Sequence, residues 1–296
     1  MLKQVCQQSL ASCGMLLIDK PEGITSFDVI RQLRRVCSVR KMGHTGTLDP
    51  FATGLLPILL GKATRLNTWV SGQSKTYEVE MELGRRTDTG DPTGELIETT
   101  PVPVLDDAAL AALVPQVLAI TEQTPPAYSA VKVDGRRAYK LARDGKPVSL
   151  TPRPVRIESF DILSFELPRL RYRVGVSKGT YVRALSESIA AMLGTVGVTT
   201  ALRRSGVGAL AVADAVPLDA LTPENWQQSL LSPARALGHL PAAHLADDQL
   251  TPFSQGRALP ALDGVVGTVV VLGEDGLLWG IAEATAERLQ PRVVLL

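Results

Sequence analysis

The pattern of apolar and polar positions predicts three strands within the first 240 residues. Gly14–Asp19 (GMLLID) is an apolar run of strand length, which is typical of a buried strand. In Thr76–Leu83 (TYEVEMEL) polar residues alternate with apolar or aromatic ones, so one face of the strand is expected to be buried and the other to meet solvent. Arg171–Val176 (RYRVGV) alternates in the same way.

Helical patterns lie between these strands. Thr25 and Asp28 form a capping box, and the apolar residues after it recur at helical spacing. Asp106–Leu118 is rich in alanine and leucine, and Ser186–Leu193 is also helical, with Gly194 as its stop. Strands mixed with separate helices predict an α+β fold on a mixed, largely antiparallel sheet.

The last part of the chain has a different pattern. Pro217–Pro241 is rich in proline and polar residues and is expected to lead out of the main domain. Short apolar runs follow, separated by glycine, aspartate and proline, which is typical of a small all-β module. We therefore expect an N-terminal extension at residues 1–13, a main domain at 14–240 and a small β module at 241–296.

The amino-acid composition indicates the general class of protein. The 296 residues are 45% apolar and 21% charged, as in ordinary globular proteins, and this length suits one large and one small domain. The longest uncharged stretch is too short for a membrane span, and the amino terminus does not resemble a signal peptide. The three cysteines are typical of reduced thiols, and the histidines lack zinc-site spacing. We expect a cytoplasmic protein without a metal site.

Charge is unevenly distributed along the chain. The net charge of +1 argues against a nucleic-acid partner, but residues 241–296 carry −4, which leaves +5 for residues 1–240. One basic cluster lies between Asp28 and Asp49, and a second, Lys132–Arg156, has eight basic residues and two acids. Such clusters on a nearly neutral protein favour a polyanion that docks at one face. For the first cluster, a solvated helix face is the alternative.

The densest group of unusual residues is Gly43–Pro50 (GHTGTLDP). Its two glycines indicate backbone turns or close approach to a ligand. Asp49 and Pro50 also have a purely structural interpretation, because aspartate is a common helix N-cap and proline is common at the first helical position.

Six blocks of the sequence resemble the TruB family of pseudouridine synthases, in the family's order and at its spacing. The blocks are LLIDKPEGITS (16–26), GHTGTLDPFATGLLP (43–57), GKATR (61–65), LGRRTDTGDPTG (83–94), PPAYSAVKVDGRRAYKLARDG (125–145) and SKGTYVRAL (177–185). Together they cover the chain from about Gly14 to Arg204. Six blocks in order are far more specific than any single motif.

The resemblance implies an isomerase, a tRNA pseudouridine(55) synthase that flips one uridine out of the TΨC loop and needs no cofactor or metal. Asp49 matches the essential catalytic aspartate. Its carboxylate could act as a nucleophile at the ribose or the base, or as a base at the sugar. Enclosure raises the pKa of a carboxylate unless a cation compensates, and Arg183 matches the arginine that pairs with this aspartate. A surface arginine on a strand-to-helix turn is the alternative.

Five further residues match positions that contact the substrate. The resemblance implies that Tyr77 stacks on the target base, that Tyr181 and Leu202 line the uracil pocket, and that His44 helps to open the loop. Stacking is needed because extruding a base costs a few kcal/mol, of which one aromatic contact returns about 1–3 kcal/mol. Core packing is the alternative for Tyr77, and an incidental loop histidine for His44. Lys20 matches a lysine near the active site whose role is left open.

A basic segment follows within the fifth block. Arg136, Lys140 and Arg143 are spaced i, i+4 and i+7, which predicts one face of a short helix and a finger suited to phosphates. It resembles the family's RNA-binding flap, at about residues 125–153, inserted in a catalytic domain at 14–240. Since RNA loops are recognised by shape and splayed bases, a mobile basic flap would fit this substrate.

The β module at 241–296 resembles the family's PUA-like domain through GIAEA and LQPRVVL. Its charge of −4 suits phosphate binding poorly. The expected partner is the TΨC stem-loop of tRNA, bound by a monomer without a guide RNA or a membrane. Two alternatives stay open: the guide-dependent branch of the superfamily, which modifies rRNA in a ribonucleoprotein, and an RNA chaperone that folds tRNA by binding alone. Chaperone and enzyme activities could also coexist.

Overall fold

The computed structural model describes residues 13–129, 131–133, 135–145 and 148–295. The chain forms two compact units. The first contains the described residues up to Asp49, Gly54–Gly72 and Gly208 onwards, and the second contains Pro50–Thr53 and Gln73–Val207. The domain boundaries expected from the sequence stay a prediction.

The first unit is built around two buried antiparallel strands, β1 (Gly14–Lys20) and β3 (Thr53–Leu60). Their residues 15–18 and 55–60 are continuous apolar runs because both faces of each strand are buried. Two short strands extend the pair: β15 (Val216–Pro217) lies parallel to β1, and β2 (Met42–His44) lies antiparallel to β3. The predicted strand at Gly14–Asp19 is thus confirmed, one residue longer.

Helix α2 (Ser26–Cys37) follows β1 and begins at the predicted capping box. The Thr25 hydroxyl accepts a hydrogen bond from the Asp28 backbone N–H at 3.0 Å, and the Thr25 N–H donates to the Asp28 carboxylate at 3.0 Å. The helix ends at Ser38, which adopts a left-handed conformation with φ of 54°. An apolar stripe along one face is buried, so the basic residues point outward.

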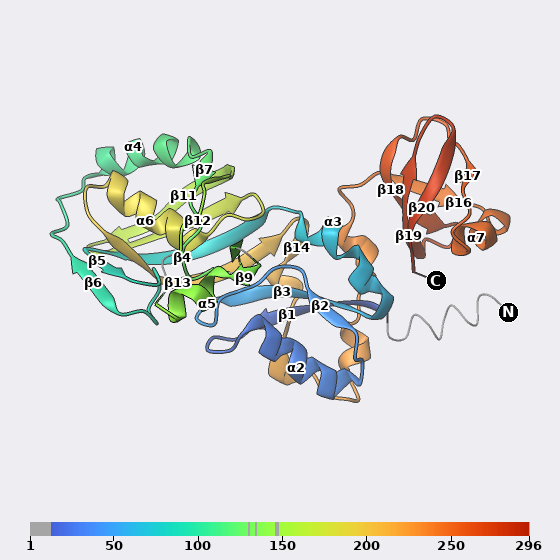
Figure 1. Ribbon diagram of the computed structural model, residues 1–296, viewed down its shortest axis with the longest axis horizontal. Helices are drawn as coiled ribbons and strands as arrows, with labels where there is room; N and C mark the ends of the chain where they lie inside the picture. Colours follow the sequence, from blue (N-terminus) through green and yellow to red (C-terminus); the bar gives the residue numbers. More distant parts are fainter. Residues whose placement is uncertain (1–12, 130, 134, 146–147, 296) are drawn as a thin grey trace. The chain divides into compact units, whose positions relative to one another are not determined.

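The predicted small β module is confirmed at the end of the chain. Its five strands have the order β16-β18-β19-β20-β17, and α7 (Asp247–Ser254) packs beside them (Figure 1). The strands are β16 (Ala242–Leu245), β17 (Leu259–Pro260), β18 (Gly267–Gly273), β19 (Leu278–Ala284) and β20 (Arg288–Val294). Gly280 is required, because a Cβ there would lie 1.9 Å from the Val293 carbonyl oxygen of the adjacent strand.

The second unit contains an antiparallel sheet centred on β4 (Lys75–Leu83). It lies between β12 (Arg169–Val176) and β13 (Gly197–Val207), and β11 (Ile157–Glu166) pairs with the far side of β12. Helices α4 (Asp107–Leu118) and α6 (Val182–Met192) cover one face of this sheet (Figure 1). The α+β class and the mixed, largely antiparallel sheet are confirmed.

Short elements complete both units. In the second unit they are β5 (Arg85–Thr87), β6 (Leu96–Thr99), β7 (Glu122–Gln123), β8 (Lys132–Val133), β9 (Arg136–Arg137), α5 (Ala138–Arg143) and β10 (Arg153–Pro154). In the first they are η1 (Gly61–Leu66), α3 (Asn67–Ser71), β14 (Leu210–Ala211), η2 (Val212–Asp214), η3 (Leu218–Ala220), η4 (Trp226–Ser229) and η5 (Pro233–Ala236). Among the described residues, no helix is both long and apolar enough to cross a membrane.

Candidate active site

Asp49 lies in the loop that joins β2 to β3, and its side chain is half-buried. The residue before it is fixed to helix α2 by two hydrogen bonds. The buried Ser26 hydroxyl accepts from the Leu48 N–H at 2.8 Å and donates to the Leu48 carbonyl at 3.1 Å. The chain then turns at Pro50 and Phe51 and enters β3, so the interpretation of Asp49 as a helix N-cap is wrong.

Two further predicted residues lie on the strands beside this loop. His44 is the last residue of β2 and is opposite Ile58 of β3. Lys20 is fully buried at the end of β1, where its ammonium donates to the carbonyls of Pro21 and Ile24, each at 2.8 Å. These bonds give Lys20 a structural role that the sequence did not reveal, because they close the turn that leads into α2.

Tyr77 and Leu202 lie on neighbouring strands of the second unit. Tyr77 is opposite Val174 of β12 and Arg204 of β13, and Leu202 is opposite Val79. Directly opposed residues of antiparallel strands point to the same face, so both side chains lie on the same side of the sheet. Tyr77 is 8% exposed and Leu202 is 7% exposed. Base stacking by Tyr77 stays a prediction.

Buried positive charge lies beside Tyr77 on this face. Burial lowers the pKa of Lys75 to about 8, and the nearby charges of Arg204 and Lys178 act in the same direction. The Lys75 ammonium donates to the Gln73 carbonyl, and Arg204 is 1% exposed. The Tyr77 end of β4 and β13 is therefore cationic.

Arg183 is the second residue of α6 and is only 4% exposed, so its interpretation as a surface arginine is wrong. Its guanidinium forms an ion pair with the Asp91 carboxylate at 3.5 Å and donates to the carbonyls of Thr89 and, at 2.9 Å, Tyr128. One side chain thus joins α6 to two loops of the second unit. Its pairing with Asp49 stays a prediction.

Asp91 is a functional candidate that the sequence analysis missed. Its buried carboxylate accepts hydrogen bonds from the hydroxyl of Thr89 at 2.8 Å and from the hydroxyl and N–H of Thr93 at 2.6 and 3.0 Å. These bonds aim the carboxylate at Arg183. The available signal was the block TDTGDPTG, in which Thr89 and Thr93 lie two positions before and after Asp91.

Tyr181 is the N-cap residue of α6, and its side chain is half-buried. The amide of Gln123 holds its backbone from both sides, accepting from the Tyr181 N–H at 2.8 Å and donating to the Tyr181 carbonyl at 3.0 Å. Gln123 belongs to β7, which pairs with β10. The base of the predicted flap is therefore joined to the start of α6.

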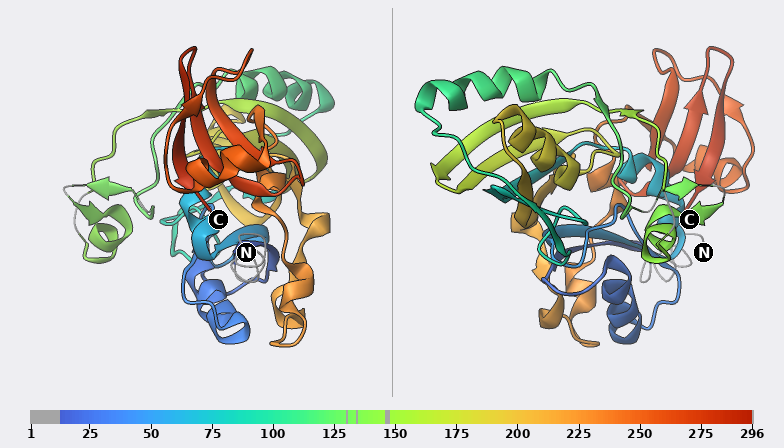
Figure 2. Two further views of the ribbon diagram at one scale, coloured as in Figure 1. Left: turned by 90° about the vertical axis from the view of Figure 1, so that its right-hand side faces the viewer. Right: turned by 60° about the vertical axis from the view of Figure 1, so that its left-hand side comes forward.

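The flap consists of the hairpin β8-β9 and helix α5, which stand away from the strands of the sheet (Figure 2, left). Lys140 and Arg143 are exposed on α5, as predicted, and the Arg143 guanidinium lies 5.8 Å from the centre of the Tyr139 ring. The predicted helical position of Arg136 is wrong. Gly135, with φ of 79°, turns the chain into β9, and the Arg136 guanidinium there pairs with Asp144 at 3.0 Å.

The predicted residues are divided between the units. Lys20, His44 and Asp49 belong to the first, whereas the second carries Tyr77, Arg136, Lys140, Arg143, Tyr181, Arg183 and Leu202. Within the described part of the chain, no three histidine, cysteine, aspartate or glutamate side chains are grouped in a way that could hold a metal ion.

Sequence comparison identifies two matching family models. The one described as "TruB family pseudouridylate synthase (N terminal domain)" matches residues 34–182, and the one described as "Pseudouridine synthase II TruB, C-terminal" matches residues 241–295.

Curated relatives agree with these matches. A protein of Aromatoleum aromaticum named tRNA pseudouridine synthase B is 45% identical over 95% of this chain and 92% of its own length. One of the same name from Gluconacetobacter diazotrophicus is 44% identical over 84% of this chain and 83% of its own length. A solved chain from the crystal structure of a Cbf5-Nop10-Gar1 complex superposes with a TM-score of 0.75 over 98% of this chain and 87% of its own. At 23% identity it shows a shared fold.

Proposed function

The chain belongs to the TruB family of pseudouridylate synthases, and we propose that it converts one uridine, at position 55 in the TΨC loop of tRNA, to pseudouridine. Enzymes of this family are isomerases. The observation that carries the tRNA assignment is the 45% identity, over 95% of the chain, to a protein named tRNA pseudouridine synthase B. An isomerisation neither adds nor removes atoms.

In the proposed reaction the bond between the ribose and N1 of uracil breaks, the base turns over, and a bond forms between the ribose and C5. The proton lost from C5 is balanced by one gained at N1. Asp49 provides the carboxylate, as a nucleophile at the ribose or the base or as a base at the sugar. The hydrogen bonds of Ser26 to Leu48 support this role, because they fix the backbone that presents the carboxylate.

Arg183 is proposed to balance the charge of Asp49. Its guanidinium is buried and oriented by Asp91 and by two carbonyls, so its position is fixed before substrate binds. Because the guanidinium is already in place, it does not have to move during the reaction. Asp91 would then be a positioning residue that acts through Arg183.

The extruded base would stack on Tyr77, with Leu202 and Tyr181 completing its pocket and His44 helping to open the loop. Lys140 and Arg143 would contact backbone phosphates, which supply affinity but no sequence information. We propose that the protein carries out this reaction in the cytoplasm as a monomer, and that it needs neither a cofactor nor a guide RNA. Since opening and reclosing a loop is itself a refolding event, a tRNA chaperone activity could accompany the enzymatic one.

The decisive test is incubation of the purified full-length protein with an unmodified tRNA transcript, followed by mapping of pseudouridine in the RNA. We expect modification of the TΨC-loop uridine without any guide RNA. Modification that appears only with a guide would replace this proposal by the guide-dependent alternative. Accelerated tRNA folding without any pseudouridine would replace it by the chaperone alternative.

A further inference from the structure

The outer face of α2 combines exposed arginines with an exposed aromatic ring. Phe27 is 58% exposed, and Arg31, Arg34 and Arg35 are also exposed. With about 100° of rotation per residue, Phe27, Arg31 and Arg34 form one stripe, with Arg35 beside it. The opposite face, which includes Val29 and Leu33, is fully buried, so folding does not explain the outer stripe.

Positive charge on this surface greatly exceeds negative charge. From α2 to Asp49 the chain has five cationic side chains, and Asp28 is the one carboxylate before that aspartate. Asp28 pairs with Arg31 at 2.6 Å, while the Arg34 guanidinium lies 5.9 Å from the centre of the Phe27 ring. Arg40 and Lys41 are exposed just beyond the helix and extend the basic surface.

A second row of three arginines in the protein provides a useful contrast. Arg169, Arg171 and Arg173 alternate along β12 and are all exposed. Their partners on β4 are Glu82, Glu80 and Glu78, and Arg173 pairs with Glu78 at 3.0 Å. This row is balanced by an equal number of carboxylates, whereas the row on α2 has one.

Stabilisation of the helix explains only some of the residues exposed on the α2 surface. Arg34 and Arg35 lie in the last turn, where cations interact favourably with the helix dipole. That effect falls off within a turn, so it does not explain Arg40 or Lys41. Nor does it explain why a phenylalanine is exposed beside the arginines.

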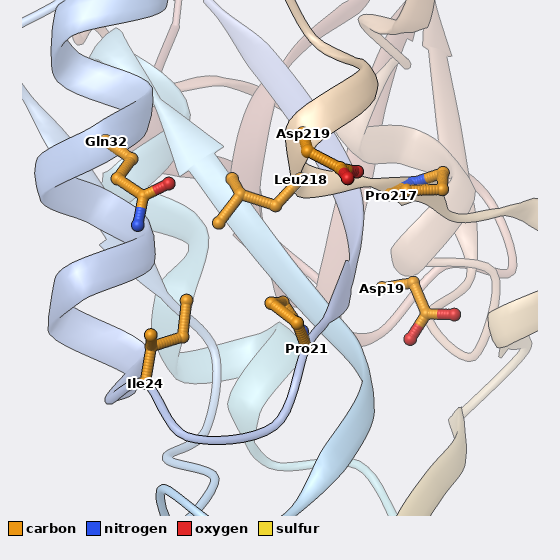
Figure 3. Close-up of a pocket in the computed structure, with 7 residues that line it drawn as sticks. All are labelled: Asp19, Pro21, Ile24, Gln32, Pro217, Leu218 and Asp219. Atoms are coloured by element: carbon orange, nitrogen blue, oxygen red, sulfur yellow. The ribbon is translucent and has the colours of Figure 1, made fainter.

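Two acidic side chains lie on the other flank of α2. A cavity of about 210 Å³ is lined there by Asp19 and Asp219, and Gln32 reaches toward it from α2 (Figure 3). Gln32 is about 140° round the helix from Phe27. The two flanks therefore differ in charge, and a polyanion would be drawn to the stripe that contains Phe27 and Arg34.

We propose that the outer face of α2, from Phe27 to Lys41, is a second RNA-binding surface, which contacts backbone phosphates of the substrate. The arginines and Lys41 would neutralise phosphates, and Phe27, held against Arg34, would offer a stacking surface for a base. This inference rests on the proposed function for the identity of the RNA. It adds a binding surface outside the active-site residues and the flap.

The test compares two triple variants of the full-length protein. R31Q/R34Q/R35Q removes the α2 charges, and R169Q/R171Q/R173Q is the matched control on β12. Equilibrium binding of a tRNA transcript is measured over a range of salt concentrations, and thermal unfolding verifies that both variants are folded. We expect the α2 variant to bind about tenfold more weakly near 0.1 M salt. The slope of log affinity against log salt concentration should also become shallower by about 2–3, because each phosphate contact contributes about 0.9 to this slope.

The control is expected to retain the wild-type slope. A folded α2 variant with an unchanged slope would overturn the inference. As a separate measurement, F27A should weaken binding by about threefold or more without changing the slope, since stacking releases few counterions.

Pseudouridine formation by the wild type, measured on the same transcript, separates this inference from the proposed function. A wild type that modifies the transcript, with an α2 variant that binds normally, leaves the function standing and rejects the surface. A wild type that forms no pseudouridine but shows the α2-dependent salt slope rejects the function and retains the surface.

Discussion

The two units hold their candidate residues in different ways. In the first, Asp49 lies in a loop, and the backbone beside it is fixed by neutral hydrogen bonds from Ser26. In the second, Arg183 lies in a helix, and its own charged group is held by Asp91 and two carbonyls. The backbone next to Asp49 is thus held by a neighbouring helix, whereas the guanidinium of Arg183 is held by its own contacts.

This difference predicts how each region responds to mutation. A neutral hydrogen bond contributes about 1 kcal/mol net to stability, whereas removal of one partner of a buried ion pair costs about 3–5 kcal/mol. Changes at Arg183 and Asp91 should therefore alter folding and activity together. Changes to the carboxylate of Asp49 itself should alter activity far more than folding.

The largest effect is expected for Asp49→Asn, which keeps the size of the side chain but removes its charge and nucleophilicity. Turnover should fall at least about 10³-fold, because the chemical step depends on this carboxylate. Affinity for tRNA should change by less than about tenfold, roughly 1.4 kcal/mol, because phosphate contacts supply most of it. Turnover and equilibrium binding should be measured on the same preparation. Near-normal turnover would remove Asp49 from its catalytic role.

Replacing Asp91 should lower both the stability of the fold and the turnover. Asp91→Ala removes a carboxylate beside a buried guanidinium, so the free energy of unfolding should fall by about 3–5 kcal/mol. Turnover should fall by about 10²-fold, because the position of Arg183 becomes less fixed. Denaturant unfolding and single-turnover kinetics would measure the two effects.

Asp91→Asn is the milder companion to this variant. Its amide oxygen can still accept from Thr93, so it should fold even if the alanine variant does not. Unchanged stability in both variants would show that the ion pair is not structural.

The contrast between the units also explains what could be predicted from the sequence. Strand β4 and the capping box of α2 were predicted because both depend on neighbouring residues. Asp91 and Ser26 were missed because each has one partner that is distant in sequence: Asp91 pairs with Arg183, and Ser26 bonds a residue 22 positions away. Helix α6 begins at Val182, before the predicted Ser186, because Gln123, 58 positions from Tyr181, holds the backbone at its N-cap.

Arg136 illustrates a different kind of error. The spacing of Arg136, Lys140 and Arg143 fits a helix, but the same spacing is compatible with a strand that runs into a helix. The decisive residue was Gly135, whose positive φ turns the chain and starts β9. Asp49 itself was assigned through the family resemblance, because aspartate before proline has a common structural interpretation.

A smaller effect is expected for Ser26→Ala, which tests the loop side of the comparison. It removes both hydrogen bonds to Leu48 and leaves two backbone groups without that partner, at a cost of about 1–3 kcal/mol. Displacement of the Asp49 loop should lower turnover by about tenfold or more, with little change in tRNA affinity.

Ser188→Ala is the matched control for Ser26→Ala. It removes one hydrogen bond, from the Ser188 hydroxyl to the Ala184 carbonyl within α6, and this bond involves no loop residue. Both variants should be compared by denaturant unfolding and by single-turnover kinetics. If Ser26→Ala loses stability but retains full turnover, Ser26 does not set the position of Asp49.

The smallest effects are expected in the flap, where the predicted cations are exposed. Lys140→Ala combined with Arg143→Ala should weaken tRNA binding by about tenfold near 0.1 M salt and make the log–log salt slope shallower by about 2, since two phosphate contacts are lost. Arg136→Ala should weaken binding by less than about threefold, because Asp144, at 3.0 Å, already compensates this charge. Filter binding over a salt series measures both. If Arg136→Ala changed the slope as much as the double variant, the pair with Asp144 would have to open when RNA binds, and exposed ion pairs are weak enough to permit this. If neither variant changed the slope, the flap would face away from the RNA, and the affinity would have to come from other basic surfaces.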